Sequence, residues 1–78
     1  MTKGQEEFIG QMTRKLLVTW CDRALKLGAV ENGLHISKEE AVYQEHAVEK
    51  KWLAKPDSNG FQRILSPGWE TAARFLKR

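Results

Sequence analysis

The sequence predicts a small α+β domain in which a long helix, a second helix, a two-stranded hairpin and a C-terminal helix follow one another. Three observations lead to this prediction. Apolar residues recur at three- and four-residue steps over residues 5–27, Glu40 follows Ser37 by three positions, and Asn59-Gly60 separates two short runs that contain apolar residues. A chain of 78 residues builds one core, so we expect residues 1–78 to form a single domain.

The first predicted helix runs from Gln5 to Leu27, and Gly28 is a suitable residue to end it. Its apolar residues cover a wide arc, so it should face the core on more than one side, either as one helix or as two. Cys21 lies on this arc and has no second cysteine to pair with. We therefore expect Cys21 to pack as a small apolar residue in a reducing compartment, which favours a cytoplasmic location.

A turn at Asn32-Gly33 should lead into a short strand, Leu34–Ile36, before the second helix begins. Ser37 and Glu40 form a capping-box pattern, which predicts a helix that continues to about Lys51. Most faces of this helix are charged, and its acidic residues outnumber its basic ones before residue 50.

The hairpin is predicted from two strands, Leu53–Lys55 and Phe61–Leu65, around a type I′ turn at Asn59-Gly60. Ser66 should then cap the final helix, which continues to about Lys77 with Pro67 as its first residue. Proline is accepted at that position because its missing N–H has no partner there in any helix.

Three tryptophans are many for a chain of this size, and they fall on or next to the three predicted helices. We expect Trp20, Trp52 and Trp69 to share an aromatic core. The alternative is that the last helix uses part of this apolar surface to contact a partner or a second copy. The residues of that candidate interface are Trp69, Phe75 and Leu76.

Charge is divided unevenly along the chain, although the net charge is only +3. Residues 31–49 carry one lysine against five glutamates, whereas residues 50–78 carry seven basic residues against two acidic ones. The predicted hairpin and final helix are therefore the basic part of the molecule, and the second helix is the acidic part.

Two segments resemble small bacterial winged-helix proteins. Residues 47–55, Ala-Val-Glu-Lys-Lys-Trp-Leu-Ala-Lys, are similar to the end of a recognition helix and the first strand of a wing. Residues 64–70, Ile-Leu-Ser-Pro-Gly-Trp-Glu, are similar to a second wing strand that enters a helix. The resemblance covers residues 37–78 and implies a winged-helix-like fold that binds double-stranded DNA and regulates transcription, with a homodimer as the expected state.

If the domain binds DNA, basic and amide side chains of the wing and the final helix should contact phosphates and the minor groove. These are Lys50, Lys51, Lys55, Asn59, Gln62, Arg63, Arg74, Lys77 and Arg78. The same basic residues could equally be the solvated side chains of an ordinary surface. The other function that stays open is a protein-interaction module, in which the acidic helix presents Glu39, Glu45 and Glu49 to a basic partner.

We expect no enzymatic activity, because the sequence has no glycine-rich phosphate loop, nucleophile elbow or triad-like pattern. His46 and Glu49 have the spacing of metal ligands on a helix, but two ligands do not make a site, so we expect no metal and no cofactor. No apolar stretch approaches the roughly 20 residues that span a bilayer, and the N-terminus lacks the apolar core of a signal peptide.

Overall fold

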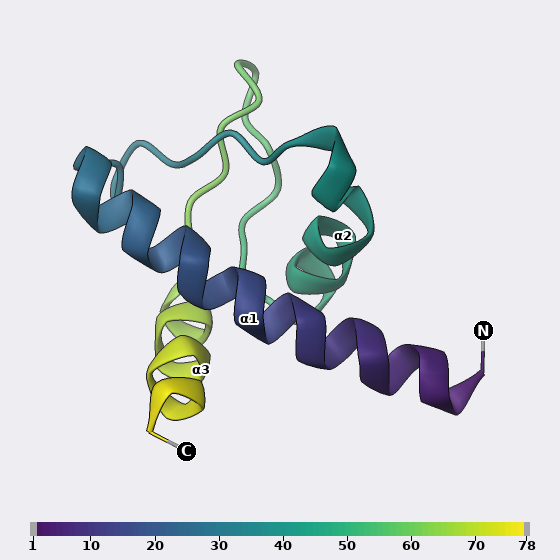
Figure 1. Cartoon of the computed structure of the whole chain (residues 1–78). Coiled ribbons are helices and arrows are strands. Elements are labelled where there is room, and N and C mark those ends of the chain that lie inside the picture. The colour runs from purple at the N-terminus through teal and green to yellow at the C-terminus, as the bar shows by residue number, and fades with distance from the viewer. Residues whose placement is uncertain (1, 78) are drawn as a thin grey trace.

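The computed structural model describes residues 2–77, which form three α-helices and one short 3₁₀ helix. The elements are α1 (Lys3–Leu27), η1 (Lys38–Glu40), α2 (Ala41–Glu49) and α3 (Ser66–Leu76). Helix α1 crosses the molecule, and both α2 and α3 pack against it (Figure 1). The segment between α2 and α3 doubles back on itself and projects from the helices, and we call it the 52–65 loop.

The predicted α+β fold with a two-stranded wing is wrong. The structure is about 63% helical with only 5% of residues in strand-type bridges, and residues 2–77 contain no sheet. Two isolated antiparallel bridges stand where strands were expected, Leu34 with Gln62 and Leu53 with Ile64. The hydrogen bonds of residues 61–65 are thus divided between two partner segments, and Pro56 supplies no N–H, so no continuous ladder develops.

Helix α1 is a single unbroken helix, and its predicted end at Gly28 is confirmed. Gly28 adopts the left-handed conformation with φ 63° and closes the helix. The helix begins earlier than expected, because Thr2 and Gln5 form a capping box in which each side-chain oxygen accepts from the backbone N–H of the other residue.

The predicted capping box at Ser37 does not form. The Ser37 hydroxyl donates to the Glu40 carboxylate at 3.1 Å and makes no bond to the helix backbone. The other oxygen of Glu40 accepts a hydrogen bond from the Trp20 indole at 3.3 Å, so this carboxylate ties α1 to the start of α2. The first turn after Ser37 is the 3₁₀ helix η1, and α2 begins only after it. Helix α2 ends at Glu49 and not at about Lys51 as predicted.

The turn of the 52–65 loop also differs from the prediction. A type I′ turn needs positive φ at both central residues, but here only Gly60 has it, with φ 82°. The Asp57 carboxylate shapes the turn by accepting from the backbone N–H of Asn59 at 2.8 Å and of Phe61 at 3.0 Å. Helix α3 then begins at Ser66, one residue before the expected Pro67, and Ser66 is inside the helix and not its cap.

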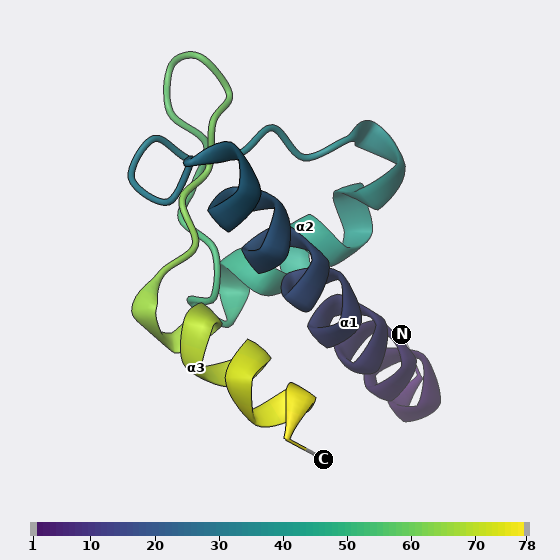
Figure 2. The same cartoon turned by 60° about the vertical axis from the view of Figure 1, so that its left-hand side comes forward.

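The core lies where α1, the 52–65 loop and the first turns of α3 meet. Trp20 is fully buried, Trp52 is 8% exposed, and Trp69 packs against the same cluster, which confirms the predicted shared aromatic core. Cys21 is buried, as expected for a small apolar residue. Figure 2 shows the turn after α1 rising beside the base of the 52–65 loop, where Leu34 pairs with Gln62. The buried apolar residues are Leu17, Trp20, Cys21, Ala24, Leu34, Ala47, Trp52, Leu53, Ile64 and Ala72.

Candidate functional site

Most of the predicted DNA-contacting residues are exposed to solvent. None of them forms an ion pair within residues 2–77, where the single ion pair joins Lys26 to Asp22 at 3.0 Å. Their charge is therefore available to an external partner. The exposed members of the set are Lys50, Lys51, Lys55, Asn59, Arg63, Arg74 and Lys77. Arg78 lies outside the described residues.

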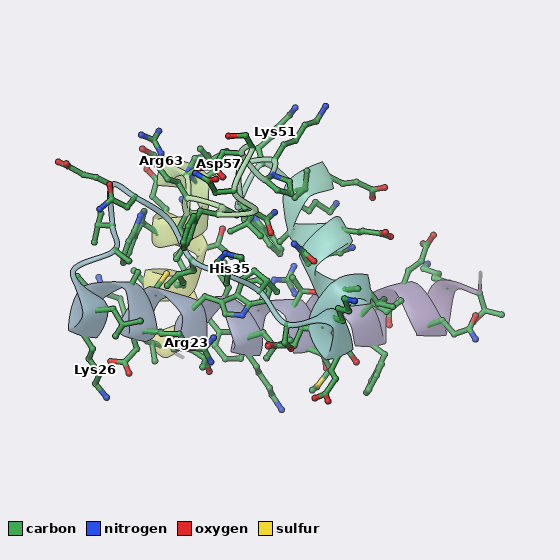
Figure 3. All side chains as sticks on the ribbon, turned by 90° about the horizontal axis from the view of Figure 1, so that it is seen from above. Arg23, Lys26, His35, Lys51, Asp57 and Arg63 are labelled. Carbon is green, nitrogen blue, oxygen red and sulfur yellow. The ribbon has the colours of Figure 1, made fainter. Side chains whose placement is uncertain are left out.

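The basic residues do not surround the molecule evenly. Figure 3 shows Lys51 and Arg63 on the side away from α1, together with Asp57, whereas Arg23 and Lys26 lie along α1. Of the four cations that Figure 3 labels, Lys26 alone has an ion-pair partner among the described residues, Asp22. We call the exposed residues Lys51, Lys55 and Arg63, which lie in the 52–65 loop or directly before it, the loop cations.

Backbone hydrogen bonds hold the loop cations in place. The Ala54 N–H donates to the Arg63 carbonyl at 2.8 Å, which brings Arg63 beside the strand-like segment that carries Lys55. Closer to the tip, the Asp57 N–H donates to the Phe61 carbonyl at 2.9 Å. The loop thus presents its cations from a fixed backbone even though it is not part of a sheet.

Gln62 has a structural role that the sequence pattern did not indicate. It is only 1% exposed, and its side chain donates to the Ala54 carbonyl at 2.9 Å and accepts from Gln44 of α2. Its backbone N–H and carbonyl both pair with Leu34. Gln62 therefore joins three segments of the chain and has no side-chain atom left to contact DNA. The sequence feature that could have suggested this is that Gln62 stands two positions before the core residue Ile64, and so on the same face of an extended segment.

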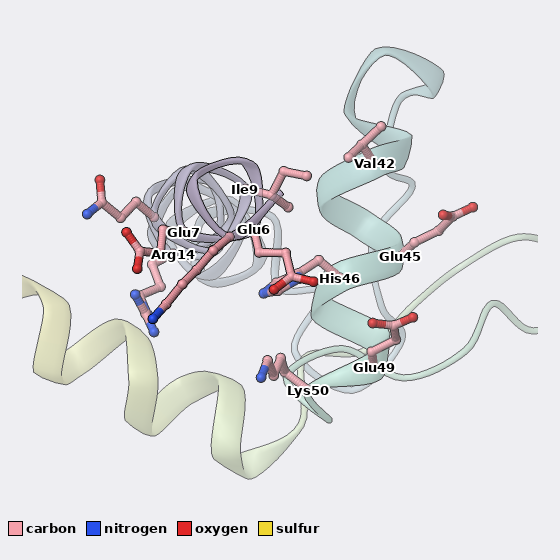
Figure 4. A pocket seen from close by; sticks show the side chains of 12 residues that line it. Glu6, Glu7, Ile9, Arg14, Val42, Glu45, His46, Glu49 and Lys50 are labelled. Carbon is pink, nitrogen blue, oxygen red and sulfur yellow. The ribbon is translucent and has the colours of Figure 1, made fainter. Parts of the chain in front are cut away.

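A groove lies between the N-terminal half of α1 and α2, with a volume of about 620 Å³ (Figure 4). Its charged lining is mixed and contains more acidic than basic residues. The carboxylates are Glu6, Glu7, Glu45 and Glu49, and the cations are Lys3, Arg14 and Lys50, with His46 between them. Among the residues that the structure describes, no group of three or more His, Cys, Asp or Glu side chains is arranged to hold a metal ion.

His46 packs between this groove and the core. Its ring meets the Trp52 ring edge-on, with the centroids 5.8 Å apart. Burial lowers the pKa of His46, and the nearby Lys50 and Arg14 lower it further, while Glu49 and Glu6 act in the opposite direction. The neutral imidazole is therefore the form that fits the contact between α1 and α2.

The candidate interface on α3 is partly used inside the molecule. The Trp69 indole donates to the Ile64 carbonyl at 3.2 Å, and its ring packs against the core. Phe75 is half-buried, and Leu76 is 68% exposed. Only the end of α3 is thus open to a partner.

Cys21 is not poised for chemistry, because burial raises the pKa of its thiol to about 11 and keeps it protonated. No described helix combines the length and the apolar character that crossing a membrane requires. Comparisons with protein-family models, curated proteins and solved structures found no significant match to this chain.

Proposed function

We propose that this protein binds double-stranded DNA through the loop cations and the exposed basic residues of α3. One observation carries the proposal: Lys55 and Arg63 are exposed, form no ion pair with any described residue, and lie on a projecting segment whose backbone is held by hydrogen bonds. Cations held this way contact phosphates at a low cost in ordering. The proposal does not depend on a winged-helix fold.

The test is a fluorescence-anisotropy titration of a labelled generic duplex at about 50 and 200 mM salt, where counterion release dominates the affinity. With about five phosphate contacts, the slope of log affinity against log salt should be about −4 to −5. The double variant Lys55→Glu/Arg63→Glu should lose at least about tenfold in affinity at the lower salt, since it replaces two attractive contacts with repulsive ones.

The matched control is Lys3→Glu/Lys15→Glu, which changes the net charge by the same amount on exposed positions of α1 that form no ion pair among the described residues. It should retain most of the affinity, because both residues belong to α1 and neither belongs to the 52–65 loop or to α3. Binding that is absent, insensitive to salt, or weakened equally by both double variants would contradict the proposal.

A homodimer belongs to the same proposal, with the exposed Leu76 and half-buried Phe75 at the end of α3 as its contact. The stoichiometry of the same titration reports it, since a dimer places two chains on each duplex.

The second candidate is a protein-interaction module with no affinity for nucleic acid. Its support is that Glu39, Glu45 and Glu49 are exposed and none forms an ion pair within the described residues. If the duplex does not bind, a lysine-rich peptide should bind the native chain, and the triple Glu→Gln variant at these positions should lose that binding.

A further inference from the structure

We propose that a second groove, between α1 and α3, binds a phosphate-type dianion between the guanidinium groups of Arg14 and Arg74. The groove has a volume of about 260 Å³. Its lining residues are Arg14, Trp52, Thr71, Arg74 and Phe75. The groove shares Arg74 with the surface proposed to bind duplex DNA. Anion binding in the groove nevertheless requires neither the loop cations nor a duplex.

The charge of this groove has one sign. Two arginines line it and no carboxylate does, whereas four glutamates line the neighbouring groove between α1 and α2, to which Arg14 also belongs. Neither Arg14 nor Arg74 has a carboxylate within ion-pair distance in residues 2–77. Two unneutralised guanidinium groups on a shared groove repel each other, and a dianion between them removes that repulsion.

Arg14 is held in a defined position before any ligand arrives. Its guanidinium carbon lies 5.8 Å from the centroid of the Trp52 ring, a cation–π contact. The backbone of Trp52 is itself fixed. Its backbone N–H donates to the Ala47 carbonyl and its carbonyl accepts from the Leu65 N–H, both at 2.9 Å. Figure 4 shows Arg14 extending from α1 toward α3, the helix that carries Arg74.

The other groups in the groove determine which anion fits. The Thr71 hydroxyl already donates to the Pro67 carbonyl at 2.7 Å, so the two arginines are the charged donors. A single carboxylate is satisfied by one arginine in a bidentate pair, whereas the three free oxygens of a phosphomonoester can be shared between two. The volume is below the range of about 300–1,000 Å³ that is usual for drug-sized ligands, which favours a small charged group.

The experiment is a ¹H–¹⁵N NMR titration of the full chain with adenosine 5′-monophosphate, inorganic phosphate and adenosine, each at matched ionic strength. The Trp52 indole N–H is a suitable reporter, because it has no acceptor among the described residues while the indoles of Trp20 and Trp69 do. Both phosphates should shift this signal saturably, and adenosine should not. Tighter binding of the nucleotide would identify a phosphomonoester as the ligand, and equal binding would identify the phosphate group alone.

Arg14→Gln and Arg74→Gln should each weaken binding by about tenfold or more, the usual loss for a hydrogen bond to a charged group. Lys15→Gln removes the same charge from a neighbouring exposed position of α1 and should change binding by less than about twofold, because Lys15 does not line the groove. Arg74 is exposed and has no ion-pair partner within residues 2–77, so its variant keeps the test valid if loss of the Arg14–Trp52 contact unfolds the chain.

The inference is overturned if neither phosphate shifts the signal, if adenosine shifts it equally, or if Lys15→Gln weakens binding as much as the arginine variants do. Reversing the charge of Lys55 and Arg63 should leave phosphate binding in the groove intact, so this result is separate from the outcome of the duplex experiment.

Discussion

Gly68 lies at the start of α3, where the helix meets the backbone of the 52–65 loop. A Cβ atom at this position would lie 2.2 Å from the Trp52 carbonyl oxygen and 2.9 Å from Cγ2 of Ile64. The Trp52 carbonyl cannot easily move away, since it accepts the Leu65 N–H. We expect Gly68→Ala to lower the free energy of unfolding by about 2–3 kcal/mol, in the range of overpacked cores, as measured by urea denaturation.

Gly4→Ala is the matched control for this substitution. It makes the same change within a helix, but nothing lies within 4 Å of the added Cβ. Because alanine has the higher helix propensity, this variant should be neutral or more stable by up to about 1 kcal/mol. A Gly68→Ala protein as stable as the Gly4→Ala protein would show that α3 can withdraw from the loop at little cost.

At the scale of single residues, the sequence predicts well what depends on hydrophobic character alone. The burial of Trp20, Trp52 and Cys21 follows from their apolar side chains and the periodicity around them. The burial of Gln62 and the stacking of Arg14 on Trp52 could not be predicted, since both depend on partners that are distant in sequence. The groove between α1 and α3 was missed for the same reason.

At the scale of elements, the contact between α1 and α2 should depend on pH through His46. Its pKa is lowered in the folded protein from an ordinary value of 6.5, so the unfolded chain binds the proton more readily. The contribution of the neutral His46 to stability is therefore fully present above pH 6.5, and it is lost as the pH falls from there through the pKa of the folded state. Thermal unfolding followed by circular dichroism between about pH 7.5 and 5 should show this decline.

His46→Gln keeps a polar side chain of similar reach and removes the titration. The decline over the same pH window should become shallower in this variant than in the native chain. An identical decline would assign the pH dependence to other groups. The groups that face His46 from the packed elements are Arg14 and Glu6 of α1, together with Glu49 and Lys50 at the end of α2.

The helices were easier to predict than the hairpin for a physical reason. Helix α1 is determined by local periodicity and by Gly28, and both act within a few residues. A strand pair requires a register, and here Gln62 pairs with Leu34 while Ile64 pairs with Leu53. The pair Asn59-Gly60 correctly predicts a reversal of the chain. It gives no information about the pairing of Gln62 with Leu34, which is distant in sequence.

At the scale of the whole molecule, the separation of charge along the sequence is only partly kept in space. The acidic residues Glu45 and Glu49 belong to α2, directly before Lys50 and the loop cations. A polyanion that approaches the loop therefore meets negative charge at one border of its contact. This arrangement limits the number of phosphates that can be engaged and favours a short contact over an extended one.

The molecule should unfold as one unit, because all three α-helices and the 52–65 loop contribute to a single core. Trp20 comes from α1, Trp52 from the 52–65 loop and Trp69 from α3, and all three belong to or pack against the same cluster. Urea unfolding followed by tryptophan fluorescence and by circular dichroism should therefore give coincident transitions. The slope should be near the lower end of the range of about 1–3 kcal/mol per molar urea, since a small chain exposes little surface.

Hydrogen exchange tests the same expectation without denaturant. The amides of Leu34 and Gln62 should exchange only with global unfolding, because their mutual bonds of 2.8 and 2.9 Å join the turn after α1 to the loop. The amide of Ser58, at the exposed tip, should exchange much faster. If Leu34 and Gln62 exchange as fast as the tip while the core amides of α1 stay protected, the loop opens independently, and the rigid presentation of Lys55 and Arg63 that supports DNA binding is lost with it.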